Sequence, residues 1–132
     1  DDLLRAELGA TGAQEGETFN LKGPPVQLTA RMAQALAMTA HELTTNAAKY
    51  GALSHSGGRI DVRWAVERRD ERRHLKLVWR EEGGAAPDPG SRRGFGLEVI
   101  ERMLPYTLGG TAKVNFGSRG IDCRVSFPLE RV

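Results

Sequence analysis

The chain has 132 residues, of which 39% are hydrophobic and 27% are charged, a balance typical of one soluble globular domain rather than of a disordered segment. The net charge of +2 is too small to indicate nucleic-acid binding, and the single cysteine, Cys123, excludes a disulfide framework and favours a reducing compartment. No apolar run approaches the roughly 20 residues that a membrane span needs, so we expect no membrane contact.

The first elements are short. Residues 1–9 are typical of the end of a helix, and we assign them to an upstream helical or linker region, with residues 10–132 forming one domain. Phe19 and Leu21 alternate with polar residues, which predicts a short edge strand. Residues 26–28 follow two prolines and are predicted to form a second short extended piece.

A long helix comes next. Thr29 is a suitable N-cap, and Gly51 follows the last periodic residue, so we expect a helix over residues 30–50. Apolar residues at helical spacing predict its core face: Ala33, Leu36, Ala37, Ala40, Leu43 and Ala47.

The second half alternates between hairpins and one helix. Alternating apolar residues predict strands over residues 59–67 and 74–81, joined by a charged turn at 68–73. A loop rich in glycine and proline then leads into a helix over 95–105 that Pro105 stops. A last hairpin closes the chain, and Cys123 is expected to be buried in its second strand. The order of elements predicts an α+β two-layer sandwich, with a mixed, mostly antiparallel sheet and helices on one face.

One stripe of the long helix carries several chemistries. Glu42, Asn46, Lys49 and Tyr50 lie three or four residues apart and therefore share a face. Carboxylate and amide oxygens suit Mg²⁺, and an ammonium group suits phosphate. The stripe therefore predicts a metal-phosphate site, with a solvated polar surface as the alternative. His41 precedes Glu42 and either has a structural role or positions that acid.

Two further stretches favour a nucleotide. Gly94-Phe95-Gly96-Leu97 leads directly into a helix, whose backbone N–H groups attract phosphate, although a plain helix-entry turn has the same pattern. Glu81 ends a strand, and Gly83 turns the chain away from it. An acid in this place can accept a hydrogen bond from the exocyclic amine of adenine, and the alternative is an ordinary charged strand end.

These three stretches, in this order, resemble the nucleotide-binding boxes of the GHKL ATP-binding fold, also called the Bergerat fold. The sequences HELTTNAAKYGALS, WREEGG and GFGLEVIERM closely resemble those of the HWE sensor histidine kinases, a family named for a histidine and a Trp-x-Glu motif. Here these residues are His41, Trp79 and Glu81. The resemblance covers nearly the whole chain, although Ala85 and Ala86 separate the glycine pair from a proline that usually follows it directly.

The resemblance implies a role for each matching residue. Asn46 would hold Mg²⁺, with Glu42 beside the metal and its waters. Lys49 would contact phosphate, and Tyr50 would line the nucleotide pocket. Glu81 would accept a hydrogen bond from the adenine amine, and Gly83 would let the chain pass the base. The lid over the phosphates would be formed by Gly94, Phe95, Gly96 and Leu97.

The resemblance also implies a function. The chain would be the cytoplasmic, bacterial ATP-binding domain of a two-component sensor kinase, using ATP and Mg²⁺ and serving a response regulator. It would supply the γ-phosphoryl group to a histidine on an upstream dimerisation domain absent from this chain, since none of the three histidines here matches that acceptor. The alternatives are a stand-alone GHKL serine kinase of the anti-sigma type and a non-catalytic nucleotide-sensing module.

Overall fold

The computed structural model describes residues 19–50, 58–69, 71–82, 100–102, 106–116 and 121–129. Several expectations therefore lie outside the described residues: the helix end at 1–9, the stop at Gly51, the loop around Gly83, and the glycine-rich helix entry at 94–97.

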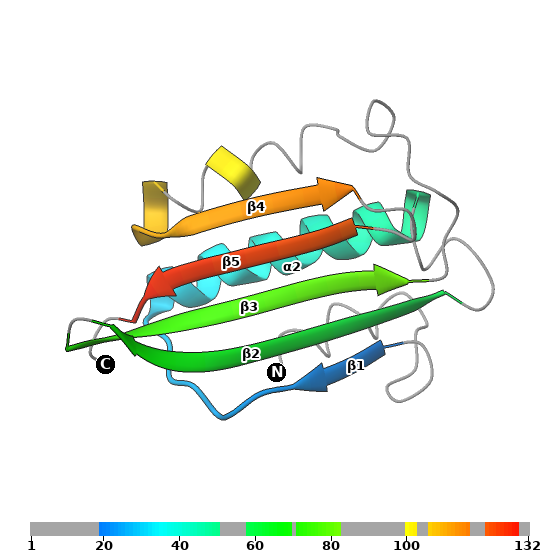
Figure 1. Ribbon diagram of the computed structural model, residues 1–132. Helices are drawn as coiled ribbons and strands as arrows, with labels where there is room; N and C mark the ends of the chain where they lie inside the picture. The colour runs from blue at the N-terminus through cyan, green and yellow to red at the C-terminus, as the bar shows by residue number, and fades with distance from the viewer. Residues whose placement is uncertain are drawn as a thin grey trace.

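A five-stranded mixed sheet forms one layer (Figure 1). Its strands lie in the order β1-β2-β3-β5-β4, and only the pair β1 and β2 is parallel. The prediction of a mixed, mostly antiparallel sheet is therefore confirmed. The bounds are β1 Phe19–Lys22, β2 Arg59–Arg69, β3 Arg72–Glu82, β4 Thr111–Phe116 and β5 Ile121–Pro128.

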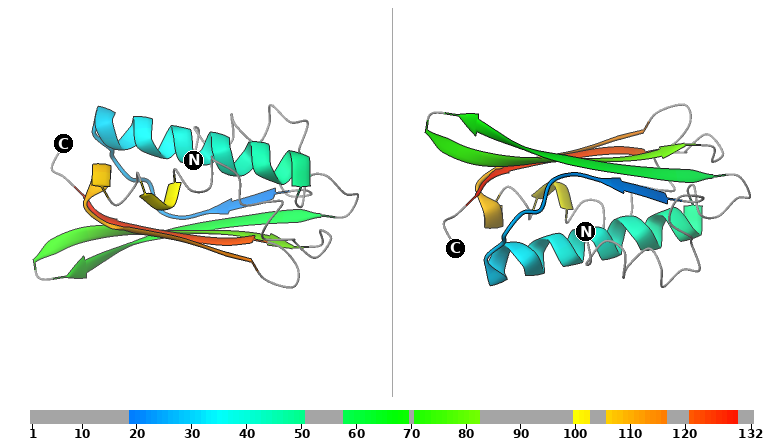
Figure 2. Two further views of the ribbon diagram at one scale, coloured as in Figure 1. Left: turned by 90° about the horizontal axis from the view of Figure 1, so that it is seen from above. Right: turned by 90° about the horizontal axis from the view of Figure 1, so that it is seen from below.

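Helix α2, Ala30–Tyr50, forms the second layer and covers one face of the sheet (Figure 2). Its N-terminus is capped as expected, because the Thr29 hydroxyl accepts a hydrogen bond from the Met32 N–H at 3.2 Å. Residues 100–102 are helical, in agreement with the helix predicted at 95–105. A further helical turn at residues 106–108 was not predicted. Within the described chain, no helix is both long and apolar enough to span a bilayer.

The core face of α2 differs from the prediction. Ala33, Leu36 and Ala37 are only half-buried, whereas Met32 and Ala35 are buried against the sheet. The helix has alanines on nearly every side, so the apolar pattern alone leaves its rotation ambiguous by a fraction of a turn. The packed sheet selects the side with Met32 and Leu43.

Two further expectations at the strands were wrong. Residues 26–28 form no strand. The charged stretch at 68–73 is mostly strand, because β2 reaches Arg69 and β3 begins at Arg72. Between the two strands, Glu71 takes the left-handed conformation, with φ of 65°, that a tight hairpin turn requires.

Alternation along the strands fills the core as predicted. Leu75, Leu77 and Trp79 of β3 are buried beneath α2. Cys123 of β5 is fully buried, as expected for a small apolar residue. Burial raises the pKa of its thiol from 9.0 to about 12, with smaller contributions from the carboxylates of Asp122, Glu101 and Glu81.

The opposite face of the sheet carries charged side chains, several of them joined as ion pairs. Asp122 accepts a hydrogen bond from Arg80 Nε at 3.3 Å and another from Arg124 Nε at 3.1 Å. Asp61 accepts one from Arg63 Nε at 2.8 Å. All these side chains lie on or near the surface, so each pair contributes little to stability.

Candidate nucleotide site

The polar stripe lies on the second half of α2, and the helix runs through all four of its positions. Glu42 and Asn46 are half-buried and one turn apart, so their oxygen atoms can act on one ligand, while His41 is exposed. For Lys49 and Tyr50 the structure describes the helical backbone but not the side chains.

Glu81 is the unusual residue of the sheet. It lies near the C-terminal end of β3 and faces the helix layer, on the same face as Leu77 and Trp79. Only 2% of Glu81 is exposed, so an ordinary solvated strand end does not describe it. Its Oε2 accepts a hydrogen bond from the indole Nε1–H of Trp79 at 3.2 Å.

The fold brings these two groups to the same end of the molecule. In Figures 1 and 2 the last turns of α2 and the C-terminal end of β3 point the same way, with the helix lying over the sheet. Glu81 therefore points into the space between the sheet and α2, and the polar stripe of α2 borders the same space. The loop residues that the sequence assigns to the same site, Gly83 and Gly94–Leu97, belong to the part of the chain that the structure does not describe.

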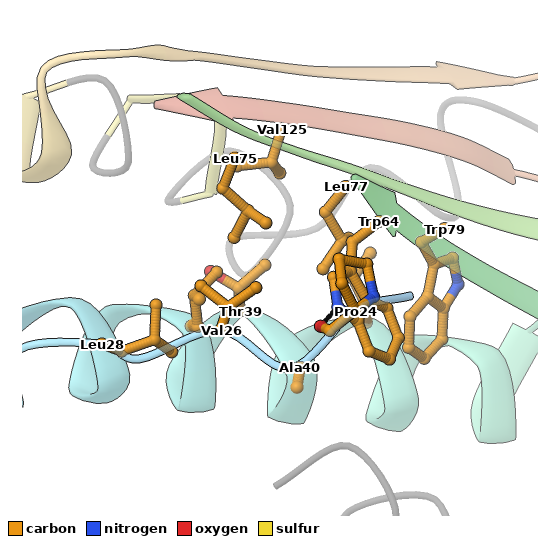
Figure 3. A pocket seen from close by; sticks show the side chains of 12 residues that line it. Pro24, Val26, Leu28, Thr39, Ala40, Trp64, Leu75, Leu77, Trp79 and Val125 are labelled. Atoms are coloured by element: carbon orange, nitrogen blue, oxygen red, sulfur yellow. Dashed lines mark hydrogen bonds between the residues drawn. The ribbon is translucent and has the colours of Figure 1, made fainter. Parts of the chain in front are cut away.

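An apolar cavity of about 90 Å³ extends from Trp79 beneath the middle of α2 (Figure 3). The irregular segment between β1 and α2 forms one of its walls, and the Trp64 indole N–H donates to the Pro24 carbonyl at 2.7 Å. No local sequence pattern indicates this cavity, because its walls come from segments far apart in the chain. The cavity is lined by Pro24, Val26, Leu28, Leu36, Thr39, Ala40, Leu43, Trp64, Leu75, Leu77, Trp79 and Val125.

The described residues contain no cluster of three histidine, cysteine, aspartate or glutamate side chains that would enclose a metal ion. The donor set on α2 is instead one carboxylate and one amide. Such a pair suits a hard cation that keeps most of its ligands as water or phosphate oxygen.

Sequence comparison finds relatives among light-responsive kinases, although no family model matches the chain. The chain is 31% identical over 134 residues to blue-light-activated histidine kinase 1 of Erythrobacter litoralis, a match that covers 99% of the chain and 36% of that protein. It is 33% identical over 114 residues to the blue-light-activated histidine kinase of Brucella anthropi, covering 86% of the chain and 23% of that protein. The chain thus spans about a third or less of these relatives.

Solved structures show the same fold. The histidine kinase domain of the Erythrobacter litoralis EL346 blue-light activated kinase matches 96% of the chain, with 57% of that domain covered, a TM-score of 0.73 and 21% identity. The catalytic domain of histidine kinase ThkA matches 97% of the chain, with 90% of that domain covered, a TM-score of 0.70 and 12% identity. The chain is therefore homologous to the blue-light-activated histidine kinases over the stretch that it matches, and it has the fold of histidine kinase catalytic domains.

Proposed function

We propose that this chain is the ATP-binding catalytic domain of an HWE-type sensor histidine kinase. The observation that carries the proposal is the buried carboxylate of Glu81, which lies at the same end of the fold as the stripe of Glu42 and Asn46. A buried acid on the sheet and hard oxygen donors on the facing helix are what the two ends of a Mg-nucleotide require.

Glu81 is assigned to the adenine end. A carboxylate has about four lone-pair sites and accepts hydrogen bonds, so it favours a base edge that donates. The 6-amino group of adenine donates two N–H groups, whereas the 6-oxo group of guanine or hypoxanthine only accepts. Hydrogen bonds to a charged acceptor contribute about 1.5–3 kcal/mol, so a carboxylate that faces position 6 of the base favours an amino group there over an oxo group.

Asn46 and Glu42 are assigned to the phosphate end, where they would hold Mg²⁺ directly or through water. The bound ion would neutralise phosphate charge. Lys49 adds a positive charge for a phosphate oxygen, and Tyr50 lines the pocket. Gly94 and Gly96, with Phe95 and Leu97, close the lid, and Gly83 lets the chain pass the base. In phosphoryl transfer these residues position the nucleotide and exclude water, because the reaction depends on alignment and charge stabilisation.

The acceptor histidine belongs to another part of the same protein, and a response regulator takes the phosphoryl group from it. This assignment predicts that the chain alone binds Mg-ATP and labels itself poorly. Incubation with γ-³²P-ATP tests this point. Strong label that is stable in base and lost in acid would show a phosphohistidine within the chain and contradict the assignment.

Calorimetry of ATP binding with and without Mg²⁺ tests the metal site. We expect Mg²⁺ to raise ATP affinity in the native chain and to have much less effect in Asn46→Ala. Asn115→Ala is the matched control, because Asn115 is exposed on β4. If Asn46→Ala keeps the full magnesium dependence, the metal role of Asn46 is wrong. Binding that is equal with and without Mg²⁺ in the native chain would instead favour a nucleotide-sensing module.

A further inference from the structure

Trp79 and Glu81 form a buried polar pair on the inner face of β3. Residues two apart on a strand share a face, and here Trp79 is 0% exposed and Glu81 2% exposed. The indole N–H is directed at the carboxylate, with Nε1 and Oε2 3.2 Å apart. Trp79 has Val62 of β2 and Cys123 of β5 as its cross-strand neighbours, both buried, so the ring is enclosed on either side.

The direction of this hydrogen bond matters for the acid. The indole ring has one donor and no acceptor, and its position in the buried core between strands β2 and β5 limits its movement. The terminal torsion of a glutamate is broad and turns easily in solution. A donor on Oε2 restricts that rotation and so contributes to the orientation of the carboxylate before any ligand arrives.

We propose that Trp79 is a positioning residue for adenine recognition, in that its indole N–H orients the Glu81 carboxylate toward the 6-amino group of the base. This inference rests on the proposed function, and it assigns Trp79 a role that acts through Glu81 rather than on the nucleotide. An acceptor that is already oriented loses less conformational entropy when the ligand binds, so the ligand binds more tightly. This gain in affinity depends on one hydrogen bond, from the 6-amino group to Glu81. It should therefore change the preference between bases and leave phosphate binding unchanged.

The test compares ATP with inosine triphosphate, which carries a 6-oxo group in place of the 6-amino group. Calorimetry in Mg²⁺ gives the ratio of the two affinities for the native chain and for Trp79→Phe, which keeps an aromatic ring and removes the N–H. We expect the preference for ATP to fall about tenfold in Trp79→Phe, mainly through weaker ATP binding. Trp64→Phe is the matched control, because the Trp64 N–H donates to the Pro24 carbonyl.

A second variant isolates the N–H from ring packing. The chain has two tryptophans, so in a Trp64→Phe background Trp79 is the one tryptophan left to replace. Substituting it with benzothienylalanine exchanges the N–H for sulfur and keeps the bicyclic shape. We expect the melting temperature of this protein to be close to that of the Trp64→Phe parent, and we expect the preference for ATP to be lost. An unchanged preference in this folded protein would overturn the inference.

Glu81→Gln separates the inference from the proposed function. If Glu81→Gln abolishes the preference for ATP while the benzothienylalanine protein retains it, Glu81 reads adenine without help from Trp79, and the inference fails alone. If Glu81→Gln also retains the preference, the adenine role of Glu81 is wrong, and the proposed site fails with it.

Discussion

The indole N–H of Trp64 and the carbonyl oxygen of Pro24 are joined by a hydrogen bond of 2.7 Å between residues 40 positions apart. Trp64 belongs to β2, whereas Pro24 lies in the irregular segment that connects β1 to α2. The bond therefore ties that segment to the sheet and helps to close the apolar cavity beneath the helix (Figure 3).

Gly23 allows this approach, and Gly23→Ala should destabilise the fold. A Cβ atom added there would lie 2.3 Å from two carbons of the Trp64 indole, closer than atoms can pack. We expect a loss of about 1–3 kcal/mol in the free energy of unfolding, measured by urea denaturation. Combining the change with Trp64→Leu should cost less than the sum of the two single changes, because the clash is already relieved. Strict additivity would contradict the assigned contact.

Leu43 and Leu36 both line the cavity, but they differ in burial, so replacing each with alanine should destabilise the fold to a different extent. Leu43 is 1% exposed, whereas Leu36 is half-buried. Leu43→Ala enlarges the cavity inside the core, and we expect it to lower the free energy of unfolding by about 2–5 kcal/mol. Leu36→Ala removes the same atoms at a partly solvated position and should cost clearly less. Equal losses in thermal or urea unfolding would show that α2 packs on the sheet through a different face.

The contrast between these leucines shows where the sequence was informative. Both were predicted to face the core, and only Leu43 is fully buried. Strand alternation predicted the buried face of β3, with Leu75, Leu77 and Trp79, because a period of two leaves only two faces to choose from. A helix rich in alanine offers a continuous range of rotations, and the sheet decides among them.

The arrangement of the candidate site follows from the sequence only in part, for a related reason. Glu42 and Asn46 share a stripe because helix geometry is local, so their juxtaposition follows from spacing alone. The burial of Glu81 does not follow from spacing, because charged strand ends are usually solvated. The alternation of Leu75, Leu77 and Trp79, continued one step to Glu81, indicates only that Glu81 shares their face, and the hydrogen bond to Trp79 is seen in the structure alone.

Glu101 protects an edge of the sheet, and removing its carboxylate should open that edge. Strand β4 is the last strand in the sheet order, and its Val114 N–H donates to Glu101 Oε2 at 3.2 Å. We expect Glu101→Ala to speed amide hydrogen exchange at Val114 and to cost about 1–3 kcal/mol, since a partly buried donor loses a charged acceptor. Glu101→Gln keeps an acceptor oxygen and should recover part of the protection. Unchanged exchange at Val114 in Glu101→Ala would show that another group satisfies the amide.

Cys123 should make stability depend on pH in the alkaline range. In the native state burial raises the pKa of its thiol to about 12, whereas the unfolded chain ionises near 9.0. Below pH 9 both states hold the proton and the thiol has no effect on pH dependence. Between pH 9 and 12 the unfolded state loses the proton first, so the free energy of unfolding falls by up to about 1.4 kcal/mol per pH unit.

Urea denaturation from pH 8 to 10.5 measures this fall, and Cys123→Ala provides the comparison because it lacks the thiol. Lysine and tyrosine side chains titrate in both proteins, so the difference in slope belongs to Cys123. We expect the variant to start less stable, through lost packing, and to decline less steeply. Iodoacetamide should also modify the native thiol far more slowly than the unfolded one at pH 8.5, since the thiolate is the nucleophile. Parallel slopes together with rapid native alkylation would mean that the Cys123 thiol is open to solvent.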